Sequence, residues 1–236
     1  MPERLRGLFV TGTDTGVGKT VLAAAIVAAL RARGDAVTAL KPVITGLDEP
    51  SDPVWPRDHE LLADVAGSSA EDVALISYGP PVSPHLAAQL SGRPIDTAGL
   101  ENRIRAAASS DAITVVEGAG GLLVPLADGY DIRALARQLE LPLVIAARPG
   151  LGTINHTLLT LEAARWAGLR VAGVVVTPWP QAPEAIARSN RETIERLGNV
   201  RVSVLPELPG PDRAALAAAG ARLPLEEWVP GPELCT

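Results

Sequence analysis

The sequence predicts an α/β fold, in which helices cover both faces of a mostly parallel sheet to form a three-layer sandwich. Six apolar segments of strand length alternate with helical segments, which is typical of parallel sheets. Hydrophobic residues make up 47% of the chain and aromatic residues only 3%, so its core must consist of aliphatic side chains that suit a buried parallel sheet. The 236 residues are enough for one such domain, and we expect residues 1–236 to form it.

Each expected element has a local signal of its own. Strands are expected at 8–12, 37–43, 113–117, 141–147, 171–176 and 200–205, where β-branched and aliphatic residues gather. Helices are expected at 21–30, 58–67, 97–108, 157–166 and 182–197, with one or two helical turns within 83–90. The segment after Pro209 is rich in proline, and we expect it to pack without regular structure.

Composition excludes several classes of protein. The net charge of −6, the pI near 5.2 and the lack of a basic run argue against a nucleic-acid partner. No apolar run reaches the roughly 20 residues that a membrane-spanning helix needs. The single cysteine, Cys235, excludes an internal disulfide and is consistent with a reducing compartment. Because residues 1–6 lead directly into the first strand and leave no room for a signal peptide, we expect a cytoplasmic protein.

The segment from Leu8 to Thr20 indicates a phosphate-binding loop (P-loop). An apolar strand leads through a glycine-rich turn to Lys19 and Thr20, which open the apolar helix 21–30. Glycines let backbone N–H groups surround an anion, the lysine adds a charge, and the threonine hydroxyl can bind Mg²⁺. The loop is a variant, because Thr13 stands where the usual pattern has its first glycine. A turn without a ligand has no use for this lysine and threonine, so the pattern predicts the fold of the P-loop NTPases.

Three further charged residues are expected near this loop. Lys41 ends the second strand and Glu117 ends the third, and parallel strands bring such ends to one edge of the sheet. Glu117 is placed to hold Mg²⁺, directly or through water. Asp58 lies in the first turn of a helix, where it either caps the helix or completes a magnesium site with Thr20. The sequence leaves these two roles of Asp58 open.

Five motifs then show a resemblance to a known family. They are Thr11–Thr20, Lys41–Gly46, Ser83–Ala87, Val116–Gly121 and Leu151–Thr160, and they follow one another in order over most of the chain. Together they resemble the dethiobiotin synthetases, which use CO2 and a nucleoside triphosphate to close a cyclic urea on 7,8-diaminononanoate in biotin biosynthesis. The resemblance implies an ATP-dependent cyclo-ligase that forms C–N bonds, with Mg²⁺ and ATP as cofactors.

The resemblance also implies roles for individual residues. The catalytic groups would be Lys19, Lys41 and Thr15, and the magnesium ligands Thr20, Asp58 and Glu117. The nucleotide would bind at Gly16, Val17, Gly18, Lys19, Thr20, Val21, Glu117, Gly118, Ala119, Gly120, Thr177, Pro178, Pro206, Glu207 and Leu208. The substrate would bind at Thr45 and, across a homodimer interface, at Leu151, Gly152, Thr153, Ile154 and Asn155 of the second subunit.

Two departures from the family pattern concern the nucleotide. Gly16 stands where several members have an acid, so the resemblance leaves the contact of this loop with the nucleotide open. Residues Thr177–Pro180 stand where many members have an Asn-Asp pair that reads adenine. ATP is the expected nucleotide, and the sequence leaves another nucleoside triphosphate open.

Three other classes share parts of this pattern. Partner-regulated ATPases that partition plasmids or position division sites carry an additional lysine where Asp14 stands, and they lack the Lys41–Pro42 turn. Glutamine-dependent amidotransferases of the cobyrinate type need a cysteine nucleophile, a role that Cys235 at the terminus cannot fill. A nucleotide-binding module without chemistry would not need Lys19, Lys41 and Glu117 together.

Overall fold

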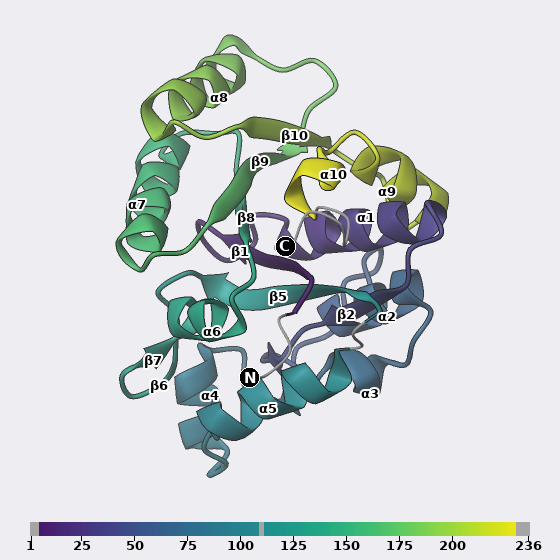
Figure 1. The fold of residues 1–236 in the computed structure, drawn as a ribbon, viewed down its shortest axis with the longest axis vertical. Helices are drawn as coiled ribbons and strands as arrows, with labels where there is room; N and C mark the ends of the chain where they lie inside the picture. The colour runs from purple at the N-terminus through teal and green to yellow at the C-terminus, as the bar shows by residue number, and fades with distance from the viewer. Residues whose placement is uncertain (1–4, 109–110, 230–236) are drawn as a thin grey trace.

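A central sheet of six parallel strands organises the computed structural model, which describes residues 5–108 and 111–229. The strands lie in the order β10-β9-β8-β1-β5-β2, and every pairing is parallel (Figure 1). Their bounds are β1 Gly7–Gly12, β2 Val37–Leu40, β5 Ile113–Gly121, β8 Leu143–Ala147, β9 Val171–Trp179 and β10 Val202–Pro206. The predicted parallel sheet is therefore confirmed, whereas Cys235 and residues 1–4 lie outside the described residues.

Two small strand pairs and one broken strand were not predicted. The pairs are β3 (Val43–Ile44) with β4 (Ile76–Ser77), and β6 (Pro125–Ala127) with β7 (Tyr130–Asp131). The strand expected at 37–43 is divided between β2 and β3, because Pro42 has no N–H to continue the ladder. Instead the Pro42 carbonyl accepts a hydrogen bond from the Ile76 N–H at 2.9 Å, which brings β4 beside the end of β2.

Helices cover both faces of the sheet, as predicted. In Figure 1, α1, α9 and α10 lie on one side of the strands, and α6, α7 and α8 lie on the other. The helices are α1 Lys19–Ala32, α2 Asp58–Ala66, α3 Ala70–Val73, α4 Pro84–Leu90, α5 Thr97–Ala107, α6 Ile132–Leu139, α7 Thr153–Trp166, α8 Ala185–Gly198, α9 Arg213–Gly220 and α10 Leu225–Trp228. None of those in the described ranges has the length and apolar character needed to cross a membrane.

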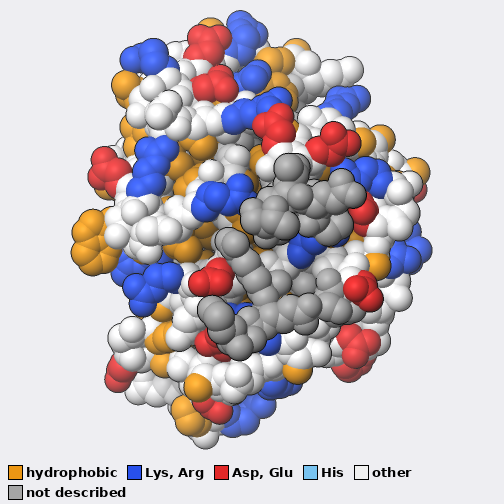
Figure 2. Space-filling model, in the orientation of Figure 1, with side chains coloured by type: hydrophobic (Ala, Val, Ile, Leu, Met, Phe, Trp, Pro, Cys, Tyr) orange, Lys and Arg blue, Asp and Glu red, His pale blue; other side chains and the backbone are white. Residues whose placement is uncertain are grey.

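The strands alternate their side chains between two apolar cores. In β1, Leu8 and Val10 pack in the core under α1, while Phe9 packs in the core with α5 and α6. All three side chains are fully buried. This alternation follows from the strand period of two and fixes β1 in the middle of the sandwich. On the outer face shown in Figure 2, acidic and basic side chains are interspersed, and hydrophobic side chains show between them.

The expectation of irregular packing after Pro209 is wrong, because α9 forms there and packs against α1. The Asp212 side chain caps α9 by accepting a hydrogen bond from the Ala215 N–H at 2.8 Å. A Cβ added at Gly220 would lie 2.0 Å from the Ala25 carbonyl oxygen, so the two helices approach through backbone contact. Two faces of α1 are thereby covered, and all residues from Leu22 to Leu30 are buried.

Sequence patterns also missed α6 and misplaced the start of α7. In α6 the buried positions Ile132, Leu135, Ala136 and Leu139 have helical spacing, and Asp131 caps the helix, so a signal was present. Helix α7 begins at Thr153, four residues before the expected start, because its N-cap is Gly152. The helix expected at 182–197 is α8, which begins at Ala185.

We expect the substitution Gly220→Ala to lower the free energy of unfolding by about 2–3 kcal/mol, because the added methyl group must push α9 away from α1. Chemical denaturation measures this change. Gly210→Ala is the matched control, since a Cβ there meets only a Val54 methyl group at 3.9 Å. Equal stability of the two variants would contradict close packing of α9 on α1.

Candidate active site

The P-loop connects β1 with α1 in the expected manner. Gly18 is the N-cap of α1 with φ +84°, in the left-handed region that favours glycine. No side chain caps α1, so its first N–H groups remain available for an anion. The loop is held by Arg148, which follows β8 and whose Nη2 donates to the Thr15 carbonyl at 3.0 Å. Arg148 also lies 3.6 Å from the Asp14 carboxylate.

Lys19 lies buried at the base of this loop. Its Nζ donates a hydrogen bond to the Asp14 carbonyl at 2.7 Å, and the residue is only 6% exposed. Burial, and then the positive charge of Lys41, lower the pKa of Lys19 to about 8. A phosphate group at the start of α1 would restore the charge balance around this ammonium group.

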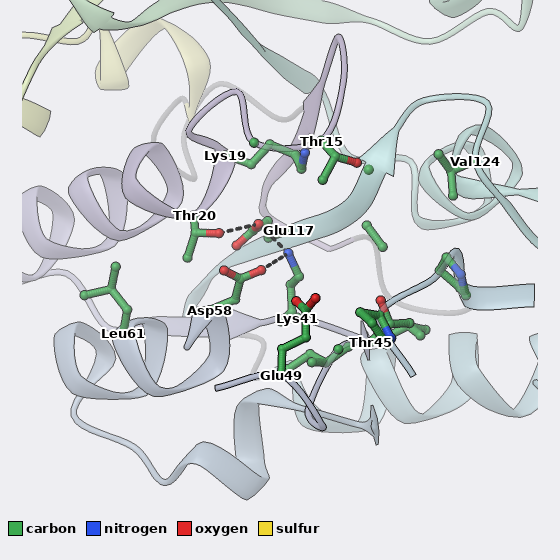
Figure 3. A pocket seen from close by; sticks show the side chains of 18 of the residues that line it. Thr15, Lys19, Thr20, Lys41, Thr45, Glu49, Asp58, Leu61, Glu117 and Val124 are labelled. Carbon is green, nitrogen blue, oxygen red and sulfur yellow. Dashed lines mark hydrogen bonds and ion pairs between the residues drawn. The ribbon is translucent and has the colours of Figure 1, made fainter. Parts of the chain in front are cut away.

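A second buried lysine, Lys41, is enclosed by two carboxylates (Figure 3). Its Nζ lies 2.5 Å from Glu117 Oε1 and 2.8 Å from Asp58 Oδ2. The Thr20 hydroxyl donates to the same Glu117 oxygen at 2.9 Å. This four-residue group, Thr20, Lys41, Asp58 and Glu117, is called the Lys41 cluster below. It joins the P-loop, β2, β5 and α2.

The Lys41 cluster balances burial against charge. Burial alone would lower the pKa of Lys41, but Asp58 and Glu117 raise it well above its usual range, so the lysine stays protonated. Burial raises the pKa of Glu117 despite Lys41. Burial also opposes ionisation of Asp58, yet Lys41 holds the pKa of Asp58 below its usual range. The cluster therefore presents a fixed cation beside the Lys19 ammonium.

Sheet topology brings this cluster together. Strand β5 lies between β1 and β2, and Glu117 pairs with Val10 of β1. Beyond this pair the register shifts, so that Gly121 lies opposite Gly12, and β5 continues four residues past the predicted end of the strand. Asp58 is the first residue of α2 and pairs with Lys41, while the Glu60 side chain accepts from the N-cap N–H. The role of helix cap therefore falls to Glu60.

The Lys41 cluster contains oxygen atoms that could bind a magnesium ion. Within residues 5–108 and 111–229, no three His, Cys, Asp or Glu side chains gather into a metal site. The oxygens on hand are the Thr20 hydroxyl and the Asp58 and Glu117 carboxylates, which are the hard donors that Mg²⁺ prefers. The Glu117 Oε2 atom is buried and has no hydrogen-bond partner, so one oxygen remains free for a cation.

An open cavity of about 890 Å³ lies over the P-loop and the Lys41 cluster. Most of the sequence-predicted residues for phosphate, metal and the reacting groups line it. They are Thr15, Gly16, Gly18, Lys19, Thr20, Val21, Lys41, Thr45, Asp58, Glu117, Ala119 and Gly120. The structure thus brings together residues that are up to about a hundred positions apart in the sequence, such as Thr20 and Glu117.

Other predicted residues lie outside this cavity. Val17 and Gly118 are buried behind it, and Thr177 packs beside Gly18. Pro178, next to Thr177, is exposed. Pro206, Glu207 and Leu208 line another cavity of about 610 Å³ together with Trp179.

The turn predicted to bind the substrate carboxylate lies at the start of α7, away from the 890 Å³ cavity. Leu151 at its tip is 91% exposed. The turn is held from behind by the Asn190 Nδ2, which donates to the carbonyls of Pro149 and Gly150 at 3.0 Å each. Residues 151–155 keep their role in substrate binding as a prediction, because this role needs a second subunit.

Sequence reasoning missed one wall of the cavity. This wall comes from the loop 47–56, which contributes Glu49, Asp52, Trp55 and Pro56, and from the segment 81–84. The loop has no repeating pattern, and its acidic residues are typical of any surface turn. That the loop faces the cavity becomes clear only in the structure, where the loop lies between β3 and α2.

The fold and this site define a P-loop nucleotide-binding protein. A family model described as an AAA domain matches residues 6–214. ATP-dependent dethiobiotin synthetase BioD of Anaeromyxobacter dehalogenans (strain 2CP-1) is 43% identical over 195 residues, which cover 82% of this chain and 86% of the relative. The protein of the same name from Bacillus subtilis (strain 168) is 36% identical over 207 residues, which cover 86% and 88%. The chain belongs to the family of ATP-dependent dethiobiotin synthetases, as the motifs predicted.

Solved structures share the fold with this chain. Cobyrinic acid a,c-diamide synthase from Mycobacterium smegmatis, with bound ADP and magnesium, has a TM-score of 0.56 at 16% identity and 95% coverage of both chains. A ParA family ATPase from Chlorobium tepidum has a TM-score of 0.52 at 12% identity, covering 93% of this chain and 92% of its own. At such low identity these likenesses show a common fold only.

We expect the substitution Arg148→Gln to weaken Mg-ATP binding about three- to tenfold, because it removes the hydrogen bond and ion pair that hold the P-loop at Thr15 and Asp14. Isothermal titration calorimetry measures the affinity. Arg33→Gln is the control, since Arg33 follows the far end of α1 and pairs with Asp35. Unchanged affinity in the Arg148 variant would show that the loop holds its shape without this side chain.

Proposed function

We propose that this chain is a dethiobiotin synthase, which uses Mg-ATP and CO2 to carboxylate 7,8-diaminononanoate and close the cyclic urea of dethiobiotin. The observation that carries the proposal is the pair of buried lysines, Lys19 and Lys41, that face one cavity from the P-loop and from the end of β2. A P-loop that only binds a nucleotide needs the first of these lysines, Lys19, but not the second. The second, held protonated by Asp58 and Glu117, suits a reaction with another anion.

The reaction has three steps, and each one moves negative charge. One amine of the substrate gives up the proton of its ammonium form to solvent, attacks CO2 and loses a second proton to give a carbamate. A carbamate oxygen then attacks the γ-phosphorus of ATP, releasing ADP and forming a carbamic-phosphoric anhydride. The second amine attacks the carbonyl carbon of the anhydride, which closes the ring and releases phosphate. Stabilising the charge that develops on the carbamate and phosphoryl oxygens is therefore the main catalytic task.

The residues around the cavity suit this task. Lys19 and the N–H groups at the start of α1 would bind the phosphate oxygens, and Lys41 would bind the carbamate. Thr15 and Thr45 line the same cavity, where their hydroxyls can donate to phosphate and carbamate oxygens. Positioning and electrostatic stabilisation are the dominant contributions to phosphoryl transfer, so lysines held in place by hydrogen bonds and ion pairs favour the reaction.

Thr20, Asp58 and Glu117 would hold the magnesium ion, which neutralises charge on the β- and γ-phosphates when it is bound. The free Glu117 Oε2 and the short distances within the Lys41 cluster support this set of ligands. Asp58 would contribute its carboxylate as a magnesium ligand from the start of α2, so the position of this ligand depends on the first turn of that helix.

The nucleotide base would lie toward the 610 Å³ cavity, where Trp179 meets Pro206, Glu207 and Leu208. ATP is the proposed nucleotide, in agreement with the names of the relatives. The indole ring of Trp179 offers a flat apolar surface for a base, and Pro206 beside it adds apolar contact, which favours stacking over hydrogen-bonded base recognition. The sequence left other nucleoside triphosphates open, and stacking is compatible with them.

We further propose that the enzyme is a cytoplasmic homodimer. The turn 151–155 of one subunit would bind the carboxylate of the substrate held by the other, at the start of α7. The exposure of Leu151 and Leu159 supports an interface on this side of the molecule, because exposed apolar side chains gather where proteins associate.

The test of the proposed function is phosphate release from Mg-ATP with and without diaminononanoate and bicarbonate, with the organic product identified by mass spectrometry. We expect release only when both are present, together with a product that has gained one carbonyl group and lost two hydrogens. Release that is indifferent to the diamine would instead indicate an ATPase of the partner-regulated type, which has the same fold.

We expect the substitution Lys41→Met to reduce kcat about 100- to 1000-fold with little change in nucleotide affinity, because Lys41 would bind the carbamate rather than the nucleotide. Methionine fills the space of the lysine stem but leaves Asp58 and Glu117 without their cation, so circular dichroism must first show that the variant keeps its fold. Steady-state kinetics and calorimetric titration with Mg-ATP separate the two effects. An equal loss of nucleotide affinity would refute this role for Lys41.

A further inference from the structure

Four carboxylates line the 890 Å³ cavity, and three of them already have partners within the chain. Asp58 and Glu117 form the ion pairs with Lys41. The Asp52 Oδ1 atom accepts hydrogen bonds from two backbone N–H groups of its own loop, those of the second and third residues after it, at 2.8 Å each. These three side chains therefore serve the structure of the site or the proposed metal.

The fourth carboxylate, Glu49, is free. Within the part of the chain that the structure describes, its side chain makes no hydrogen bond and no ion pair. Glu49 lines the same cavity as Lys41 and Thr45, and in Figure 3 it lies on the side of Lys41 away from Glu117. It thus places an unpaired negative charge beside the groups proposed to bind the carbamate.

The backbone at Glu49 is fixed although its side chain is free. Its N–H donates to the Gly46 carbonyl at 3.2 Å, and its carbonyl accepts from Arg57 Nη2 at 2.7 Å. The same guanidinium donates to the carbonyls of Leu47 at 3.0 Å and Gly46 at 3.3 Å. The Arg57 N–H donates to the Glu60 carboxylate at 2.9 Å, so this arginine ties the loop to the first turn of α2.

Among the described residues, the P-loop side of the cavity is lined by no carboxylate. Gly16 of the P-loop lines it without a side chain, and a Cβ there would have no atom within 4 Å. An aliphatic amine has a pKa near that of lysine, about 10, and therefore enters the site as an ammonium group. The P-loop and the two lysines are sites for anions, so Glu49 is, among the described residues, the cavity carboxylate without a hydrogen bond or ion pair of its own and the candidate for the cationic end of the substrate.

We propose that Glu49 binds an ammonium group of the diamine substrate and that Arg57 is the positioning residue that holds Glu49 at the cavity. This inference rests on the proposed function, because it assumes that the substrate is a diamine. A charge-assisted hydrogen bond from ammonium to carboxylate fixes the diamine with its amines toward Thr45 and Lys41. Orientation of this kind raises the rate of ring closure, since both amines must reach the same carbon.

The first experiment compares Glu49→Gln with the wild type at saturating Mg-ATP and bicarbonate while the diamine concentration is varied. Loss of a hydrogen bond between two charged groups should raise the KM for the diamine about tenfold or more, with the KM for ATP unchanged. Glu49→Asp keeps the charge and should recover part of the affinity. Asp48→Asn is the matched control, because Asp48 is exposed on the same loop but does not line the cavity.

The outcomes separate this inference from the proposed function. If the wild type forms no product from the diamine, the proposed function itself has failed. If the wild type is active and Glu49→Gln has an unchanged KM for the diamine, the inference is wrong and the proposed function stands. A rise in KM that Asp48→Asn shares would also overturn the inference, because it would reflect the general charge of the loop.

The role of Arg57 has its own test. Arg57→Met should raise the KM for the diamine, and adding Glu49→Gln to it should have little further effect, because the carboxylate is already misplaced. Arg57→Lys, which keeps the charge but loses the fork that reaches three carbonyls, should behave like Arg57→Met. Additive effects of the two substitutions on KM would show that Arg57 does not position Glu49.

Discussion

The arrangement of the site depends on the ion pairs of one buried lysine, Lys41, with the buried Glu117 and the half-exposed Asp58. Charged groups lose their hydration when they are buried, and only close pairing offsets that loss. The distances of 2.5 and 2.8 Å from Lys41 Nζ supply the pairing. Strand β2, strand β5 and helix α2 must therefore meet at one place. The positions of the cavity, of the free Glu117 oxygen and of the loop 47–56 all depend on the packing of these three elements at this place.

A rigid frame supports the P-loop behind this ion pair. Helix α1 is buried from Leu22 to Leu30, because the sheet covers one face and α2 and α9 cover others. Alanine and glycine permit these close approaches, as at Gly220 against Ala25. The loop is tied from the other side by Arg148. A fixed helix start keeps its N–H groups aimed at the phosphate position, so the nucleotide meets a site that needs little reorganisation.

The same fold serves proteins with other activities, and the residues proposed for the chemistry of this chain lie at one edge of the sheet. The solved structures that match it include a ParA family ATPase and a cobyrinic acid a,c-diamide synthase, with TM-scores of 0.52 and 0.56. One of the motifs shared with the dethiobiotin synthetases, Lys41–Gly46, lies at this edge. That segment holds Thr45 and continues into the loop of Glu49, so the groups proposed to bind the carbamate and the diamine come from one connection between β2 and α2.

Local patterns in the sequence determined the six central strands, the P-loop with Lys19 and Thr20, and the family, because each depends on residues close together in the chain. The structure alone decided what depends on contacts between distant segments. Asp58 could have capped a helix or served the site, and only the approach of Lys41 distinguishes these roles. Helix α9 follows a proline-rich segment and owes its burial to α1. Glu49 and Asp52 look alike in sequence, but among the described residues the Glu49 side chain has no partner, whereas the Asp52 side chain is bound to its own backbone. Hydrogen bonds and burial between segments assign such roles, and no spacing within the chain encodes them.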